Sequence, residues 1–86
     1  MDLLLKELDE RYYYGECLNN GSLCAIEKVK ELMNYKNNLN ELLEAINIEE
    51  EKFRNLNTNK ASDIYVKGYL FELNYIKIRI TELNVA

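Results

Sequence analysis

The stretch that decides the fold is residues 64–83, IYVKGYLFELNYIKIRITEL. Apolar side chains recur there every three or four residues, which places them on one side of an α-helix. The shorter run Ile76–Ile80 alternates with period two and could form a strand, but the longer helical pattern outweighs it. We therefore predict a helix over about residues 60–84, whose core-facing side chains are Val66, Tyr69, Leu73, Ile76, Ile80 and Leu83.

A second apolar cluster lies on the opposite side of the same predicted helix. It consists of Ile64, Phe71, Tyr75 and Ile78. A surface helix normally carries one apolar stripe, so a helix with two must be covered from both sides. We expect another protein chain to cover this cluster. A homodimer that forms a four-helix bundle is the simplest arrangement, and a hetero-complex stays open. The alternative is that a short N-terminal helix folds over the cluster.

Residues 23–56 carry another stripe with a spacing of three and four. Its positions are Ala25, Val29, Leu32, Lys36, Leu39, Leu43, Ile46, Glu50 and Phe53. The unbroken phase predicts one long helix over residues 23–56. Asn38 and Glu41 resemble a capping box, however, and the helix could instead break there. With a turn at residues 57–59, the expected fold is all-α: an antiparallel helical hairpin.

The N-terminal part offers weaker signals. Asp2 can cap a short helix, and Ser22 is the predicted N-cap of the long helix. A β-hairpin over residues 11–26 is the alternative, because Asn20-Gly21 favours a two-residue hairpin turn. In that register Cys17 would face Cys24. Gly68 costs a helix interior about 1 kcal/mol relative to Ala, so we expect another backbone to pack closely there.

Length and charge limit the classes of function. The 86 residues form a single domain, 1–86. The net charge of −4 disfavours direct binding to nucleic acid, because an acidic chain is repelled by phosphates. No apolar run is long enough to span a membrane and no signal peptide is visible, so the cytoplasm is the expected location.

The residue types that common catalysis and metal binding require are scarce. The chain has no His, which removes the most frequent general base and a frequent metal ligand. Cys17 and Cys24 form no Cys-x-x-Cys pair, so a zinc site is not expected. A Gly-rich phosphate loop is missing from the sequence as well. We therefore expect no enzymatic activity, no catalytic residue, no metal and no cofactor.

Two further groups of residues are candidates for contact with a protein partner. Tyr is enriched at interfaces, and three consecutive tyrosines at residues 12–14 cannot all face one side of a helix. The acidic residues 49–51 could dock on a basic groove, or could form an ordinary solvated face. The candidate interaction residues are thus Ile64, Phe71, Tyr75, Ile78, Tyr12, Tyr13, Tyr14, Glu49, Glu50 and Glu51.

Residues 65–76, YVKGYLFELNYI, resemble a helix common in small uncharacterised helical proteins of phages and mobile elements. That pool includes anti-CRISPR and other anti-defence inhibitors. The resemblance implies stoichiometric binding to a host or rival protein, and it transfers no catalytic residue. The main expectation is a non-enzymatic protein–protein interaction module. The alternatives are a small DNA-associated regulator and a structural assembly subunit of a phage or plasmid.

Overall fold

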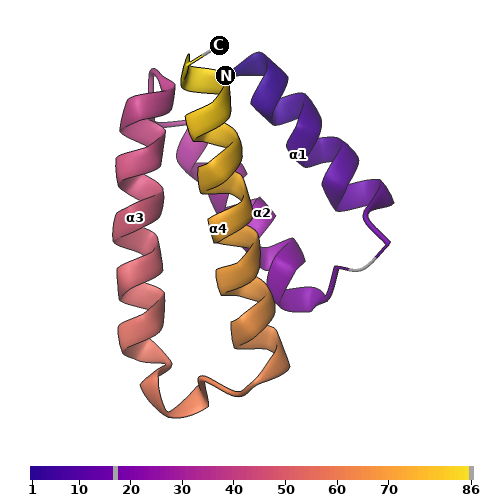
Figure 1. The fold of residues 1–86 in the computed structure, drawn as a ribbon, viewed down its shortest axis with the longest axis vertical. Coiled ribbons are helices and arrows are strands. Elements are labelled where there is room, and N and C mark those ends of the chain that lie inside the picture. The colour runs from indigo at the N-terminus through magenta and orange to yellow at the C-terminus, as the bar shows by residue number, and fades with distance from the viewer. Residues whose placement is uncertain (17, 86) are drawn as a thin grey trace.

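The computed structural model describes residues 1–16 and 18–85, and over these residues the chain forms four α-helices, one short 3₁₀ helix and no strand. The helices are α1 (Asp2–Tyr14), α2 (Asn20–Met33), α3 (Leu39–Leu56) and α4 (Ile64–Val85), with the 3₁₀ helix η1 at Thr58–Lys60. In Figure 1, α4 lies in front of α2, with α3 along one side and α1 along the other. The predicted all-α fold is confirmed.

The prediction of one continuous helix over residues 23–56 is wrong. Helix α2 ends at Met33, and α3 begins at Leu39 after an N-cap at Asn38. The Asn38 side chain accepts a hydrogen bond from the Glu41 backbone N–H (2.9 Å) and donates one to the Glu41 carboxylate (3.0 Å). The first of these bonds satisfies a backbone donor that a helix start leaves unpaired, and the second holds the two side chains together, which favours the break.

The break also has a tertiary reason. A straight helix over residues 23–56 would be about 51 Å long, whereas its partner helix α4 has 22 residues and is about 33 Å long. The apolar stripe beyond the end of α4 would then stay in water. With the break, α2 and α3 each pack against α4, and the longest dimension of the molecule is 37 Å. A single chain thereby supplies four helices without dimerisation.

Helix α2 approaches α4 closely at two glycines. A side chain at Gly21 would overlap the backbone carbonyl of Tyr65, and one at Gly68 would overlap the side chain of Asn19. Gly68 is therefore closely packed as expected, but against the Asn19 side chain rather than against a backbone, and the close backbone contact lies at Gly21. Next to Gly21, the Ser22 hydroxyl donates a hydrogen bond to the Gly68 carbonyl oxygen (3.2 Å), which joins α2 to α4.

The predicted N-cap at Ser22 is wrong, because Asn19 takes that place. The Asn19 side chain accepts a hydrogen bond from the Ser22 N–H (2.9 Å) and donates one to the Ile64 carbonyl oxygen (3.1 Å). Asn is as good a cap as Ser, and its amide can accept from α2 and donate to α4 at the same time, which leaves the Ser22 hydroxyl to bind Gly68. Since α2 starts at Asn20, the β-hairpin alternative is wrong from that residue onward; Cys17 lies outside the described residues.

Helix α4 begins at Ile64 rather than near residue 60. The Asp63 carboxylate accepts hydrogen bonds from the backbone N–H groups of Tyr65 (2.8 Å) and Val66 (3.3 Å), which caps the helix there. The segment Ile76–Ile80 lies inside the helix, so the strand alternative is wrong.

The core lies where α1, α2 and α3 meet one side of α4. Five of the six predicted core residues of α4 are buried, and Leu83 is half-buried. The Tyr69 ring stacks on Phe53 of α3, with ring centroids 3.8 Å apart. The side chains buried by the other helices are Leu4, Leu8, Ala25, Ile26, Val29, Leu42 and Ile46.

Candidate interaction surface

The side of α4 turned away from the core keeps several large apolar side chains in water. Its four large side chains are exposed to different degrees: Ile64 by 74%, Phe71 by 64%, Ile78 by 52% and Tyr75 by 37%. These are the four residues that the helical periodicity grouped together. We refer to them as the exposed α4 face. Helix α1 packs beside this face rather than over it, so the N-terminal segment does not enclose it.

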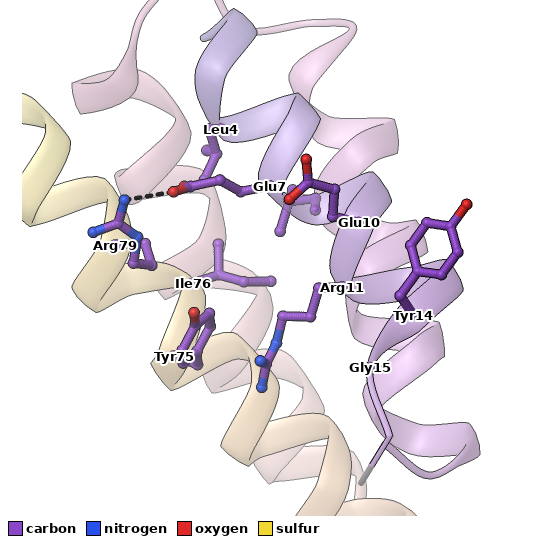
Figure 2. A pocket seen from close by; sticks show the side chains of 10 residues that line it. Leu4, Glu7, Glu10, Arg11, Tyr14, Gly15, Tyr75, Ile76 and Arg79 are labelled. Carbon is purple, nitrogen blue, oxygen red and sulfur yellow. Dashed lines mark hydrogen bonds and ion pairs between the residues drawn. The ribbon is translucent and has the colours of Figure 1, made fainter.

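Tyr75 is the least exposed member because an arginine from α1 lies on its ring. The Arg11 guanidinium carbon is 3.8 Å from the Tyr75 ring centroid, a cation–π contact. Figure 2 shows Arg11 reaching from α1 toward α4 beside Tyr75. The contact places the Tyr75 ring at the border between α1 and α4 and restrains it there.

A buried ion pair holds Arg11 in this position. Arg11 donates from Nε to Glu72 Oε2 (2.5 Å) and from Nη2 to Glu72 Oε1 (3.0 Å). The Glu72 side chain is completely buried, whereas that of Arg11 is 25% exposed. The hydrogen bond to Glu72 raises the pKa of Arg11 above its usual value, so the guanidinium stays charged.

Sequence reasoning missed this pair, although one signal was present. Glu72 lies next to Leu73 on the border of the core stripe of α4, and a carboxylate there must be paired to be buried. The identity of the partner was not readable, because Arg11 is 61 positions away in the chain.

A groove of about 340 Å³ separates α1 from α4 next to the exposed α4 face. Its two arginines are already neutralised. Arg79 donates to Glu7 (2.6 Å) and to Glu82 (3.0 Å), and Arg11 binds Glu72. The hydrogen bond to Glu7 raises the pKa of Arg79. Figure 2 shows the Arg79–Glu7 pair bridging the two helices. Because both cations have carboxylate partners, the groove offers no free positive charge for an anion.

The three tyrosines of residues 12–14 have different environments. The Tyr12 hydroxyl donates to the Glu27 carboxylate (2.6 Å), which raises the pKa of Tyr12 and ties α1 to α2. Its ring also meets the edge of the Tyr13 ring, with centroids 5.0 Å apart. Tyr13 and Tyr14 are 69% and 81% exposed. The two exposed rings lie on α1, apart from the four residues of the exposed α4 face.

The acidic residues 49–51 do not form one free acidic surface. Glu49 accepts a hydrogen bond from the Tyr69 hydroxyl (3.3 Å), and Glu50 forms an ion pair with Lys77 (3.1 Å). Glu51 is exposed. Two of the three carboxylates thus join α3 to α4, which leaves less negative charge for a basic partner.

Other candidate chemistry can be located in the same way. Cys24 is a half-buried free thiol on α2. Within residues 1–16 and 18–85, His, Cys, Asp and Glu side chains form no group of three that could hold a metal ion. None of the helices described combines the length and hydropathy that crossing a bilayer requires.

Comparison with known proteins returned no matching family model, no similar curated protein and no similar solved structure. The resemblance of residues 65–76 to phage and mobile-element proteins therefore stays a prediction.

Proposed function

We propose that this chain is a non-enzymatic protein-binding module and that the exposed α4 face is its contact surface. One observation carries the proposal: four large apolar side chains stay in water along a single side of one helix. Isolated apolar side chains are normal on protein surfaces, but several of them on one side of a single helix are typical of an interaction site.

The free energy at stake supports the same function. Burying a large apolar side chain contributes about 1.5–3 kcal/mol, so covering the exposed parts of these four would contribute on the order of 5 kcal/mol. A core in a chain of this size supplies only about 3–5 kcal/mol of stability. The free energy gained when a partner covers the exposed α4 face would therefore be similar in size to the free energy of folding of the chain.

The chemistry and rigidity of the surface suit protein binding. Phe71 and Tyr75 offer large contact areas with few rotatable bonds, and such residues often dominate the binding energy of interfaces. Both project from a helix that the core holds in place, and Arg11 restrains Tyr75. Little conformational entropy is therefore lost on binding. The lack of His in the chain favours binding over catalysis.

A charge placed on the exposed α4 face tests the proposal. Phe71→Glu should abolish association with other protein molecules, because a carboxylate would have to be buried at the contact. Leu56→Glu is the matched control, since Leu56 is 84% exposed at the end of α3 and lies off this face. Both variants should stay folded by circular dichroism, because each position is exposed.

Two measurements should be made on both variants and on the unmodified chain: molar mass by sedimentation equilibrium, and co-purification of the tagged chain with proteins of its native host. Loss of association in Phe71→Glu alone supports the proposal. If Phe71→Glu matches the unmodified chain in both measurements, the exposed α4 face is not a binding surface.

We further propose that the chain inhibits a host or rival protein by stoichiometric binding. This finer function has its support in the resemblance of residues 65–76 to small proteins of phages and mobile elements. Its test is whether a co-purified partner loses activity in proportion to added chain, and whether Phe71→Glu restores that activity.

A further inference from the structure

The exposed side of α4 carries a row of eight residues that continues beyond the four apolar ones. Successive members are three or four positions apart, except for the adjacent pair Asn74 and Tyr75, and this spacing places them on one side of the helix, opposite the core. All eight are exposed. We call this row the α4 strip; its members are Ile64, Lys67, Phe71, Asn74, Tyr75, Ile78, Glu82 and Val85.

The α4 strip is chemically symmetric about the point midway between Asn74 and Tyr75. Residues at equal distances on either side of that point match in kind. The apolar pairs are Ile64 with Val85 and Phe71 with Ile78; the charged pair is Lys67 with Glu82; and the polar pair at the centre is Asn74 with Tyr75. In two antiparallel helices related by a two-fold axis, residues equidistant from the axis face each other.

We infer that the occupant of the exposed α4 face is a second copy of this chain, whose α4 runs antiparallel and is centred between Asn74 and Tyr75. The inference rests on the proposed function, that the exposed α4 face binds protein, and names the occupant of that face. In this register each aliphatic residue of the strip and Phe71 meet an apolar residue, whereas Tyr75 meets Asn74 at the centre. Both copies of Lys67 meet a Glu82, so the dimer contains the charge pair twice.

A parallel pairing of the same strips is disfavoured by the same charges. It would place Lys67 against Lys67 and Glu82 against Glu82, which repel. Charged residues that flank an apolar helix seam commonly set the orientation of partner helices in this way. The apolar residues would pair equally well in both orientations, so the charges select the antiparallel one.

The charges on the strip are available for a partner. Among the residues that the structure describes, Lys67 takes part in no ion pair. Glu82 binds Arg79 through Oε1, and its side chain is 57% exposed. Both groups stand at the surface of α4, so neither must leave a buried position to pair across the two-fold axis.

The length of the strip suits the same arrangement. Helix α4 has 22 residues, which corresponds to about 33 Å. Helices that cross at about 20° stay in contact over such a length, as in helical bundles. A two-fold contact closes on itself and yields a dimer rather than a filament.

Charge reversal tests the orientation and the partner together. Lys67→Glu and Glu82→Lys should each weaken dimerisation at least about 10-fold, because two attractive pairs become two repulsive ones. The double variant Lys67→Glu/Glu82→Lys should dimerise within about 3-fold of the unmodified chain, because both pairs are attractive again. The control is Lys52→Glu, an exposed charge reversal on α3 that should leave the dissociation constant unchanged.

Mixing the two single variants adds a test that a local folding defect cannot mimic. One chain then carries two glutamates and the other two lysines at these positions, so the heterodimer should be tighter than either homodimer. Dissociation constants come from sedimentation equilibrium, and circular dichroism checks that each variant is helical. In about 1 M NaCl, where the Debye length is about 3 Å, the differences between variants should shrink.

Several results would overturn the inference. Single reversals that leave the dissociation constant unchanged would exclude the antiparallel register, and so would a double variant as weak as the singles. A monomeric unmodified chain whose association with a foreign protein is lost in Phe71→Glu would exclude the second copy and keep the proposed function. Phe71→Glu without effect on any association would remove both.

Discussion

The ion pair between Arg11 and Glu72 makes the sharpest prediction about stability. Replacing Arg11 with Met leaves the Glu72 carboxylate, which is completely buried, without its cation. Removing one partner of a buried pair costs about 3–5 kcal/mol. The Arg11 side chain is 25% exposed, so water can partly replace it, and we expect a loss of about 2–3 kcal/mol in the free energy of unfolding. That is much of the total for a chain of this size, about 3–5 kcal/mol.

A double-mutant cycle separates the pair from the packing of its side chains. In Arg11→Met/Glu72→Met no buried charge remains, so the double variant should recover to within about 1 kcal/mol of the unmodified chain. The assay is urea unfolding followed by circular dichroism. The control is Arg54→Met, because Arg54 is 59% exposed and its nearest contact with Glu50 is 3.9 Å; that change should cost about 0.5 kcal/mol or less.

Two results would refute this reasoning. The first is a loss below about 0.5 kcal/mol for Arg11→Met, which would mean that Glu72 does not depend on its cation. The second is a double variant whose loss equals the sum of the two single losses, because additive losses mean that the two side chains do not interact.

Two further predictions concern α2 and α3 where they contact α4. Gly21→Ala should destabilise the chain by about 1–3 kcal/mol, because the added carbon would overlap the Tyr65 backbone carbonyl, although Ala is the better helix former. The measurement is the urea midpoint of unfolding, compared with that of the exposed control Asn20→Ala. A Gly21→Ala variant that is more stable than the unmodified chain would contradict the prediction. Burial of Tyr69, followed by the charge of Glu49, raises the pKa of Tyr69 well above its usual 10. The unfolded chain then loses the tyrosine proton first as pH rises, so this contribution to stability is complete below pH 10 and falls above it. From pH 8 to pH 11 the free energy of unfolding should fall by about 1.4 kcal/mol more in the unmodified chain than in Tyr69→Phe. Urea unfolding at the two pH values measures this, and equal decreases in the two proteins would contradict the raised pKa of Tyr69.

Much of the fold and the main candidate surface followed from local periodicity. The spacing of residues 64–83 predicted both the buried side of α4 and the exposed side with Phe71 and Tyr75. The helix break was also readable, because Asn38 and Glu41 form the cap that the sequence suggested. It was outweighed in the prediction because the apolar spacing keeps its phase across residues 34–38, where the chain is not helical.

Contacts between residues distant in the chain had no local signal. The pairing of Arg11 with Glu72 and the bridge from Asn19 to Ile64 depend on how the helices cross, and similar polar residues occur throughout the chain. The same holds for Glu49 and Glu50, whose acidic run gave no hint that both turn toward α4.

The amino-acid sequence by itself determined that this protein is all-helical and that its last helix has two apolar sides. It could do so because helical periodicity depends only on residues a few positions apart. Only the tertiary structure decided that the chain itself leaves the second side uncovered. Helices α1, α2 and α3 all pack against one side of α4. The other side, with Ile64, Phe71, Tyr75 and Ile78, therefore faces water.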